Sequence, residues 1–292
     1  MALRKLAVLC LLSLTFVACI VGEIEAQTEY SIDIRDETWN HSTIRVLLIP
    51  QEDEPWWDTA AINLTFQAVE MWNNALATFA STYQDSAYLS NIRLDSTESA
   101  GAARNFDVYI SWREQFTDKV GTVGRTQLTT LSGVIESCNI TLAAKDSFGI
   151  PLTDAVNQGV AIHEIGHALG LLHANYSDDV MFNQASLDIS VRPISTLDAY
   201  GVAQVFRWRS FSSQFNPSNQ KPESNPLSLP SDIGYEYLNP PQQDTLGRIV
   251  SSLLRYIQTP EGLMALVVVF IIVAGVALIV SALHAVLQRP HE

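Results

Sequence analysis

An eleven-residue run, HEIGHALGLLH, constrains this chain more than any other feature. On a helix, His163 and His167 lie one turn apart on the same face, so both imidazoles can reach one metal ion with Glu164 beside them. Gly170 allows the chain to leave the helix through a conformation that other residues rarely adopt, and the turn then returns His173 as a third ligand. Three protein ligands leave one position open for water, which is typical of a catalytic zinc rather than of a closed structural one.

The net charge and the numbers of cysteine and histidine residues limit which partners and sites this chain can have. The formal net charge of −14 argues against nucleic acid as a partner, because phosphate binding requires a basic face. Cys138 is the only cysteine outside the N-terminal apolar run, so no internal disulfide is expected. Histidine is scarce, and three of the six in the chain stand in the eleven-residue run. This concentration disfavours the alternative that they are incidental residues of a buried amphipathic helix.

Two apolar segments predict export and membrane attachment. Leu6–Val21 follows basic residues and is short for a spanning helix, so residues 1–26 are predicted to be a signal peptide, with an N-terminal membrane anchor as the alternative. Residues 263–283 carry no charge and are long enough to cross the hydrocarbon core of a bilayer, which predicts a transmembrane helix. We therefore expect a single-pass protein of the cell membrane, with its main domain outside the cell and residues 284–292 as a short cytoplasmic tail.

The hydrophobic periodicity predicts one α/β domain over residues 27–209. Short apolar or alternating runs predict strands, and apolar residues at three- and four-residue steps predict helices. The predicted strands are 44–49, 106–112, 121–130 and 133–142, and the predicted helices are 57–79, 154–170 with Thr153 as its cap, and one that runs from the capping box Ser195–Asp198 to Trp208. This order of elements implies a twisted, mostly parallel sheet with long helices.

The composition changes after the predicted domain. Residues 210–243 are rich in Ser, Asn, Gln and Pro, which predicts a linker that is poorly able to bury a core. Residues 244–260 contain apolar residues at helical spacing and are predicted to form a juxtamembrane helix. That helix would lie on the lipid surface or act as a plain spacer.

The histidine run and the segment Asp179–Phe182 are similar to the zinc helix and the Met-turn of the metzincins. Among metzincins the chain most resembles the matrixins (the matrix-metalloprotease-like group, of peptidase family M10 type), with Trp72 in the long helix and the strand Asp107–Ile110 as further points of similarity. The resemblance covers roughly residues 40–210. It implies an α+β metzincin-like fold with the zinc helix at the cleft, in which Met181 lies under the zinc ligands as an apolar floor.

The chain departs from the matrixin pattern at two points. Ala174 stands where animal matrixins usually carry Ser after the third histidine. His41 is the only other histidine between the two predicted membrane-directing segments, so the second, structural zinc of the family is not expected. Calcium sites are left open by the sequence.

The resemblance implies an endopeptidase with one catalytic Zn²⁺, whose activated water is deprotonated by Glu164 as the general base. The two apolar segments lead us to expect that it is membrane-anchored and extracellular. A protein or peptide substrate would lie extended along the strand predicted at 121–130. Two alternatives are kept. One is a catalytically silent cell-surface binding or adhesion module that retains the fold, and the other is a zinc hydrolase that acts on a non-peptide bond.

Overall fold

The computed structural model describes residues 29–98, 105–183, 192–211, 215 and 225–238. These residues all belong to one compact unit, which runs to Asn239. The predicted signal peptide, juxtamembrane helix, transmembrane helix and cytoplasmic tail lie outside the described residues. Within the ranges just given, no helix has both the length and the apolar character needed to cross a membrane.

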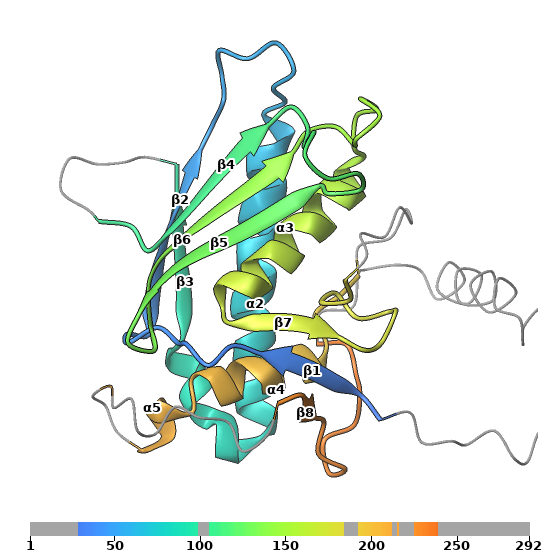
Figure 1. Cartoon of the computed structure of the whole chain (residues 1–292). Helices are drawn as coiled ribbons and strands as arrows, with labels where there is room; N and C mark the ends of the chain where they lie inside the picture. Colours follow the sequence, from blue (N-terminus) through green and yellow to red (C-terminus); the bar gives the residue numbers. More distant parts are fainter. Residues whose placement is uncertain (1–28, 99–104, 184–191, 212–214, 216–224, 239–292) are drawn as a thin grey trace, which may run out of the picture. The chain divides into compact units, whose positions relative to one another are not determined.

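A five-stranded sheet in the order β3-β2-β4-β6-β5 forms the frame of the domain (Figure 1). Its strands are β2 (Thr43–Ile49), β3 (Arg93–Thr97), β4 (Val108–Arg113), β5 (Gly124–Leu131) and β6 (Val134–Ala143). The pairs β2–β3, β2–β4 and β4–β6 are parallel, and β5 runs antiparallel to β6 at the edge. The prediction of a mostly parallel sheet is therefore confirmed.

Two long helices pack against the same face of this sheet (Figure 1). They are α2 (Ala60–Thr82) and α3 (Asp154–Ala168). The indole nitrogen of Trp72 in α2 donates a hydrogen bond to the backbone oxygen of Ile162 in α3 at 2.9 Å, which fixes the two helices against each other. The predicted cap of α3 is present, because the Thr153 hydroxyl accepts a hydrogen bond from the Val156 amide at 3.4 Å.

Three shorter helical elements complete the described part of the chain. They are the 3₁₀ segment η1 (Gln84–Asn91), α4 (Thr196–Val205) and α5 (Trp208–Phe211). The predicted capping box opens α4, since the Ser195 hydroxyl accepts from the Asp198 amide at 3.1 Å and the Asp198 carboxylate accepts from the Ser195 amide at 2.8 Å. The predicted helix to Trp208 instead breaks after Val205 and resumes as α5.

A second sheet, antiparallel and in the order β7-β1-β8, was not predicted from the sequence. Its strands are β1 (Ser31–Ile34), β7 (Leu171–Ala174) and β8 (Leu227–Ser228). The linker prediction for 210–243 is wrong for residues 225–238, because Leu227 is 4% exposed in the core. The Asn225 side chain also bonds both backbone groups of Ile34, at 3.1 and 2.9 Å. Backbone pairing, one amide side chain and several apolar side chains, among them Leu229 and Ile233, therefore attach this segment to the core.

Candidate metal centre

Two of the three predicted metal ligands lie on one face of α3. The ring centroids of His163 and His167 are 4.6 Å apart, as expected for residues one helical turn apart. The opposite face of the helix is buried through Ile162 and Ile165. Core packing therefore orients α3 so that both imidazoles point away from the hydrophobic interior.

The third histidine reaches the other two through the turn at Gly170. The helix ends at Ala168, and Gly170 has a φ of +97°, a left-handed conformation that favours glycine. The next residues form β7, and its pairing with β1 fixes the direction of the chain at His173. The ring centroid of His173 lies 5.6 Å from that of His163 and 5.1 Å from that of His167. One ligand atom from each of the three histidines lies within 4.8 Å of the others, so the group could hold a metal ion.

Backbone carbonyls orient two of these imidazoles. Nδ1 of His163 lies 2.7 Å from the Val180 oxygen, and Nδ1 of His167 lies 2.9 Å from the Leu171 oxygen. A carbonyl only accepts, so Nδ1 carries the hydrogen in both rings and Nε2 keeps its lone pair for a metal. Burial lowers the pKa of His163 to about 4 and that of His167 to about 3, which keeps both rings neutral. Neutral imidazoles with fixed tautomers fit a divalent ion such as zinc.

Glu164 lies between α3 and the edge strand β5. Its side chain is almost buried, and the Thr126 hydroxyl is 2.6 Å from its Oε2. The other carboxylate oxygen lies where a Cβ on Gly124 would be, so only glycine at 124 leaves room for this arrangement. Burial raises the pKa of Glu164 to about 7, and the hydrogen bond from Thr126 opposes this rise. The sequence analysis missed Thr126, because nothing in its own segment marks it.

The Met-turn packs beneath the metal-binding helix. Met181 is fully buried, and its sulfur occupies the space that a Cβ on Gly166 would take. Gly166 immediately precedes His167 in α3, and Trp72 closes the same space from α2. The Met181 oxygen accepts a hydrogen bond from the Ala174 amide at 3.0 Å. Met181 thus packs under α3 beside His167, and its role beneath a bound metal stays a prediction.

A cluster of polar side chains, which we call the carboxylate cluster, adjoins the Met-turn. It consists of the buried Asp179, Ser195 and Asp198 and the partly buried Tyr235. The Asp179 carboxylate accepts from the Met181 amide at 2.8 Å, from the Ser195 hydroxyl at 2.7 Å and from the Tyr235 hydroxyl at 3.0 Å. Burial, and then the nearby Asp179, raise the pKa of Asp198 well above that of an exposed aspartate. The sequence predicted only the Ser195–Asp198 part of this cluster.

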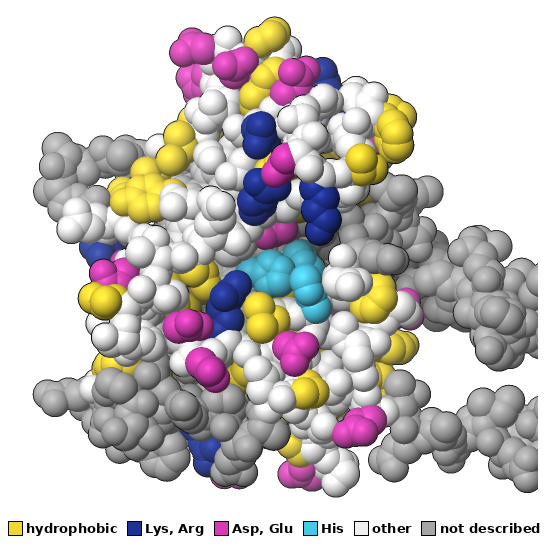
Figure 2. All heavy atoms as spheres, viewed as in Figure 1, with side chains coloured by type: hydrophobic (Ala, Val, Ile, Leu, Met, Phe, Trp, Pro, Cys, Tyr) yellow, Lys and Arg dark blue, Asp and Glu magenta, His cyan; other side chains and the backbone are white. Residues whose placement is uncertain are grey.

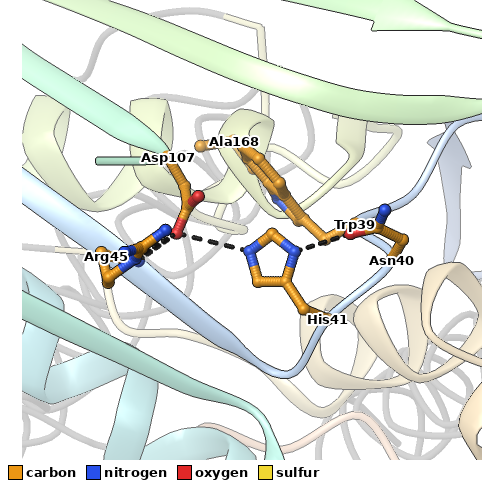
Figure 3. Close-up of polar contacts among 6 residues, drawn as sticks. All are labelled: Trp39, Asn40, His41, Arg45, Asp107 and Ala168. Atoms are coloured by element: carbon orange, nitrogen blue, oxygen red, sulfur yellow. Dashed lines mark hydrogen bonds and ion pairs between the residues drawn. The ribbon is translucent and has the colours of Figure 1, made fainter. Parts of the chain in front are cut away.

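His41, the fourth histidine among the described residues, lies in a different group. Nδ1 of His41 is 2.8 Å from the Asn40 side-chain oxygen, and its Nε2 is 3.3 Å from the Asp107 carboxylate (Figure 3). Burial would raise the pKa of Asp107, but hydrogen bonds from His41 and Arg45 lower it overall. Trp39 beside His41 donates to the Ala168 oxygen at the end of α3, at 2.8 Å (Figure 3). This group connects the sheet to the metal-binding helix.

A cleft of about 770 Å³ opens over the three histidines. α3 forms its floor with Val160, His163 and Glu164, and residues 119–126, which lead into and begin β5, form one wall. Figure 2 shows the histidine side chains together at the centre of this face. The strand order leaves one edge of β5 unpaired among the described residues, beside the cleft.

Comparison with known proteins gives one family match. The family model described as Matrixin matches residues 29–207. No sequence among curated proteins matches the chain significantly.

Two solved structures resemble the chain only weakly. The structure titled "GM1 bound form of the ECX AB5 holotoxin" is 14% identical, covers 62% of this chain and 88% of its own, and gives a TM-score of 0.33. Metalloproteinase-II from Bacteroides fragilis is 17% identical, with 56% of this chain and 54% of its own covered and a TM-score of 0.29. The chain therefore spans about half the length of that metalloproteinase, and these likenesses carry no further argument.

Proposed function

Because the chain belongs to the matrixin family of zinc metalloproteases, we propose that it is a membrane-anchored extracellular endopeptidase in which His163, His167 and His173 bind one catalytic zinc and Glu164 is the general base. The observation that carries the proposal is the convergence of three imidazoles, with ligand atoms within 4.8 Å of one another, beside a buried carboxylate in an open cleft. All the groups that the reaction requires are present, which sets this reading above that of a silent binding module.

The three histidines would hold the metal through neutral rings. Their Nδ1 hydrogens at His163 and His167 are engaged by backbone carbonyls, so the rings cannot rotate without breaking those hydrogen bonds. When bound, zinc supplies Lewis-acid chemistry that polarises the scissile carbonyl and acidifies a water molecule. Met181 is buried against Gly166, so an apolar side chain lies under the helix that carries His163 and His167.

Glu164 would move the proton. Its carboxylate takes a proton from the attacking water and delivers it to the leaving amine, so one group acts first as base and then as acid. The Thr126 hydroxyl at 2.6 Å restricts the rotation of this carboxylate and thereby sets where the proton is taken. The substrate backbone would pair with the edge of β5 that has no neighbour among the described strands, which would place the scissile bond over α3.

The decisive experiment compares cleavage of casein by the purified full-length protein and by its Glu164→Gln variant. We expect the variant to retain zinc and to lose activity by about a thousandfold, because removal of a general base usually has an effect of this order. Glu136→Gln, on the exposed part of β6, is the matched control and should cleave normally. Full activity in Glu164→Gln, or cleavage that survives complete removal of zinc, would rule out the proposal.

The membrane anchor is supported by the uncharged segment 263–283 alone. A tag placed after Glu292 should be shielded from antibody on intact cells, while surface biotin should label the domain before the segment. Release of the whole protein by an alkaline carbonate wash would contradict the anchor without affecting the proposed chemistry.

A further inference from the structure

The cleft has the opposite charge balance to the domain that surrounds it. Residues 29–207 contain 10 Lys and Arg but 23 Asp and Glu. Among the described residues, four of the cations and two of the carboxylates line the cleft. The cations are Arg35, Lys119, Arg125 and Arg192, and the carboxylates are Asp146 and Glu164. Figure 2 shows Lys and Arg side chains above and to the lower left of the histidines.

The four cations come from separate parts of the chain. Arg35 follows β1, and its amide donates to the Gly170 oxygen at 2.9 Å, next to the turn that brings in His173. Its Nε is buried and has no hydrogen-bond partner among the described residues. Lys119 is exposed and makes no ion pair with any of the described residues. Neither Arg35 nor Lys119 therefore has an ion-pair partner within the part of the chain that the structure describes.

The two remaining arginines are held in place from the cleft walls. Arg125, in β5, pairs with Asp118 at 2.6 Å and lies over the Phe116 ring. Arg192 lies over the Phe182 ring, and its guanidinium donates a hydrogen bond to the backbone carbonyl oxygen of Asp179 at 3.5 Å. These contacts hold both guanidinium groups beside the cleft. Asp118 offsets only part of the charge of Arg125, because the ion pair is exposed to solvent.

The two carboxylates that line the cleft, Asp146 and Glu164, already accept hydrogen bonds. Asp146 accepts hydrogen bonds from the amides of Phe148 and Ile150, both at 2.9 Å. Glu164 accepts from Thr126. Asp33, in β1, adds one negative charge near His173, and its charge opposes the lowering of the His173 pKa by burial. Neither cleft carboxylate forms an ion pair with the four cations.

From this arrangement we propose that the cleft selects peptide segments that carry Asp or Glu on the residues flanking the scissile bond. The inference rests on the proposed function, since it names the substrate class of the same site. Cations in a cleft with low-dielectric walls concentrate their field at the opening, and this field attracts acidic segments that the strongly negative remainder of the domain repels. The selection is therefore local to the cleft and should weaken as salt screens the charges.

The test uses three internally quenched peptide libraries that share a randomised central tetrapeptide and are flanked on both sides by Glu, Gln or Lys pairs. We expect the full-length protein to cleave the Glu library with a kcat/KM roughly tenfold above that of the Gln library at low salt. The ratio should fall toward one in about 0.5 M sodium chloride, where the Debye length is only a few ångströms. Lys119→Glu, an exposed position, should lower the ratio, and Arg93→Gln on β3 is the control that should leave it unchanged.

A binding measurement separates this inference from the proposed function. Fluorescein-labelled peptides from the same three sets are titrated against the Glu164→Gln protein, and fluorescence anisotropy reports affinity without cleavage. Tighter binding of the Glu peptides supports the inference even if no library is cut, in which case the proposed function alone fails. The inference is overturned if the Glu and Gln sets give equal affinity and equal kcat/KM, or if the protein prefers Lys. It is also overturned if Lys119→Glu leaves the Glu-to-Gln ratio of kcat/KM unchanged.

Discussion

The three histidines and the carboxylate cluster are neighbours joined by one short segment, yet they are built in opposite ways. Val180 accepts the hydrogen bond of His163. Asp179, one residue before it, belongs to the carboxylate cluster and accepts hydrogen bonds from Ser195, Tyr235 and the Met181 amide. The histidines come from eleven consecutive residues and face an open cleft. The carboxylate cluster is assembled from segments up to 56 residues apart, and its Asp179, Ser195 and Asp198 are fully buried. The histidines are therefore open to a ligand in the cleft, and the carboxylate cluster holds the turn at Met181 beneath them.

This difference predicts that the carboxylate cluster contributes strongly to the free energy of unfolding and that the histidines contribute little. Asp179→Ala should lower the free energy of unfolding by about 3–5 kcal/mol, because the amide of Met181 and the hydroxyls of Ser195 and Tyr235 all lose a buried acceptor. Urea unfolding measures the change, with Asp179→Asn as the milder control that keeps one acceptor oxygen. A loss below about 1 kcal/mol would show that the cluster does not hold the turn.

His173→Ala should give the opposite result. Cleavage should fall by more than about a hundredfold, since one of the three proposed ligands is removed. In the presence of a chelator, the variant should unfold within about 0.5 kcal/mol of the unsubstituted protein, because His173 is exposed. If the variant is strongly destabilised without metal, the separation between the two regions does not hold.

Two glycines of α3 test how closely the Met-turn supports the histidines. A Cβ at Gly166 would overlap the Met181 sulfur, so Gly166→Ala should destabilise the domain by about 1–3 kcal/mol and weaken zinc binding. A Cβ at Gly159 would meet nothing within 4 Å, so Gly159→Ala should instead stabilise the helix by up to about 1 kcal/mol. Thermal unfolding and zinc titration of both variants check the contrast, and equal behaviour would contradict it.

The smallest effect concerns pH. The pKa of Asp198 is raised in the folded state, so this carboxyl contributes stability below the unfolded pKa, and the contribution is lost as pH rises through the folded pKa. Asp198→Asn keeps an acceptor for the Ser195 amide but cannot ionise. Its melting temperature in chelator should therefore rise relative to the unsubstituted protein as pH increases from about 4. Parallel curves for the two proteins would count against a buried proton at Asp198.

The same contrast explains what the sequence could and could not predict. The spacing of His163 and His167, the turn at Gly170 and the capping box at Ser195–Asp198 are local patterns, and the structure contains all three. Thr126 was missed because its partner lies 38 residues away and no local pattern marks it.

The prediction was wrong where the composition resembled a linker. Residues 225–238 lie in a stretch rich in Pro and Ser, yet Leu227 is buried and the Tyr235 hydroxyl donates to Asp179. The short strand β3 was also missed, because its sequence RLDST is mostly polar and its pairing with β2 comes from the rest of the sheet. Elements that depend on distant partners carry little signal in their own residues.

X-ray absorption at the zinc edge, on the purified full-length protein and on His173→Ala, tests the central claim most directly. We predict one zinc per chain with three imidazole nitrogens at about 2.0–2.1 Å, and a loss of this coordination in the variant. A protein that is purified without metal, or a zinc whose ligands are unchanged by the substitution, would contradict the account.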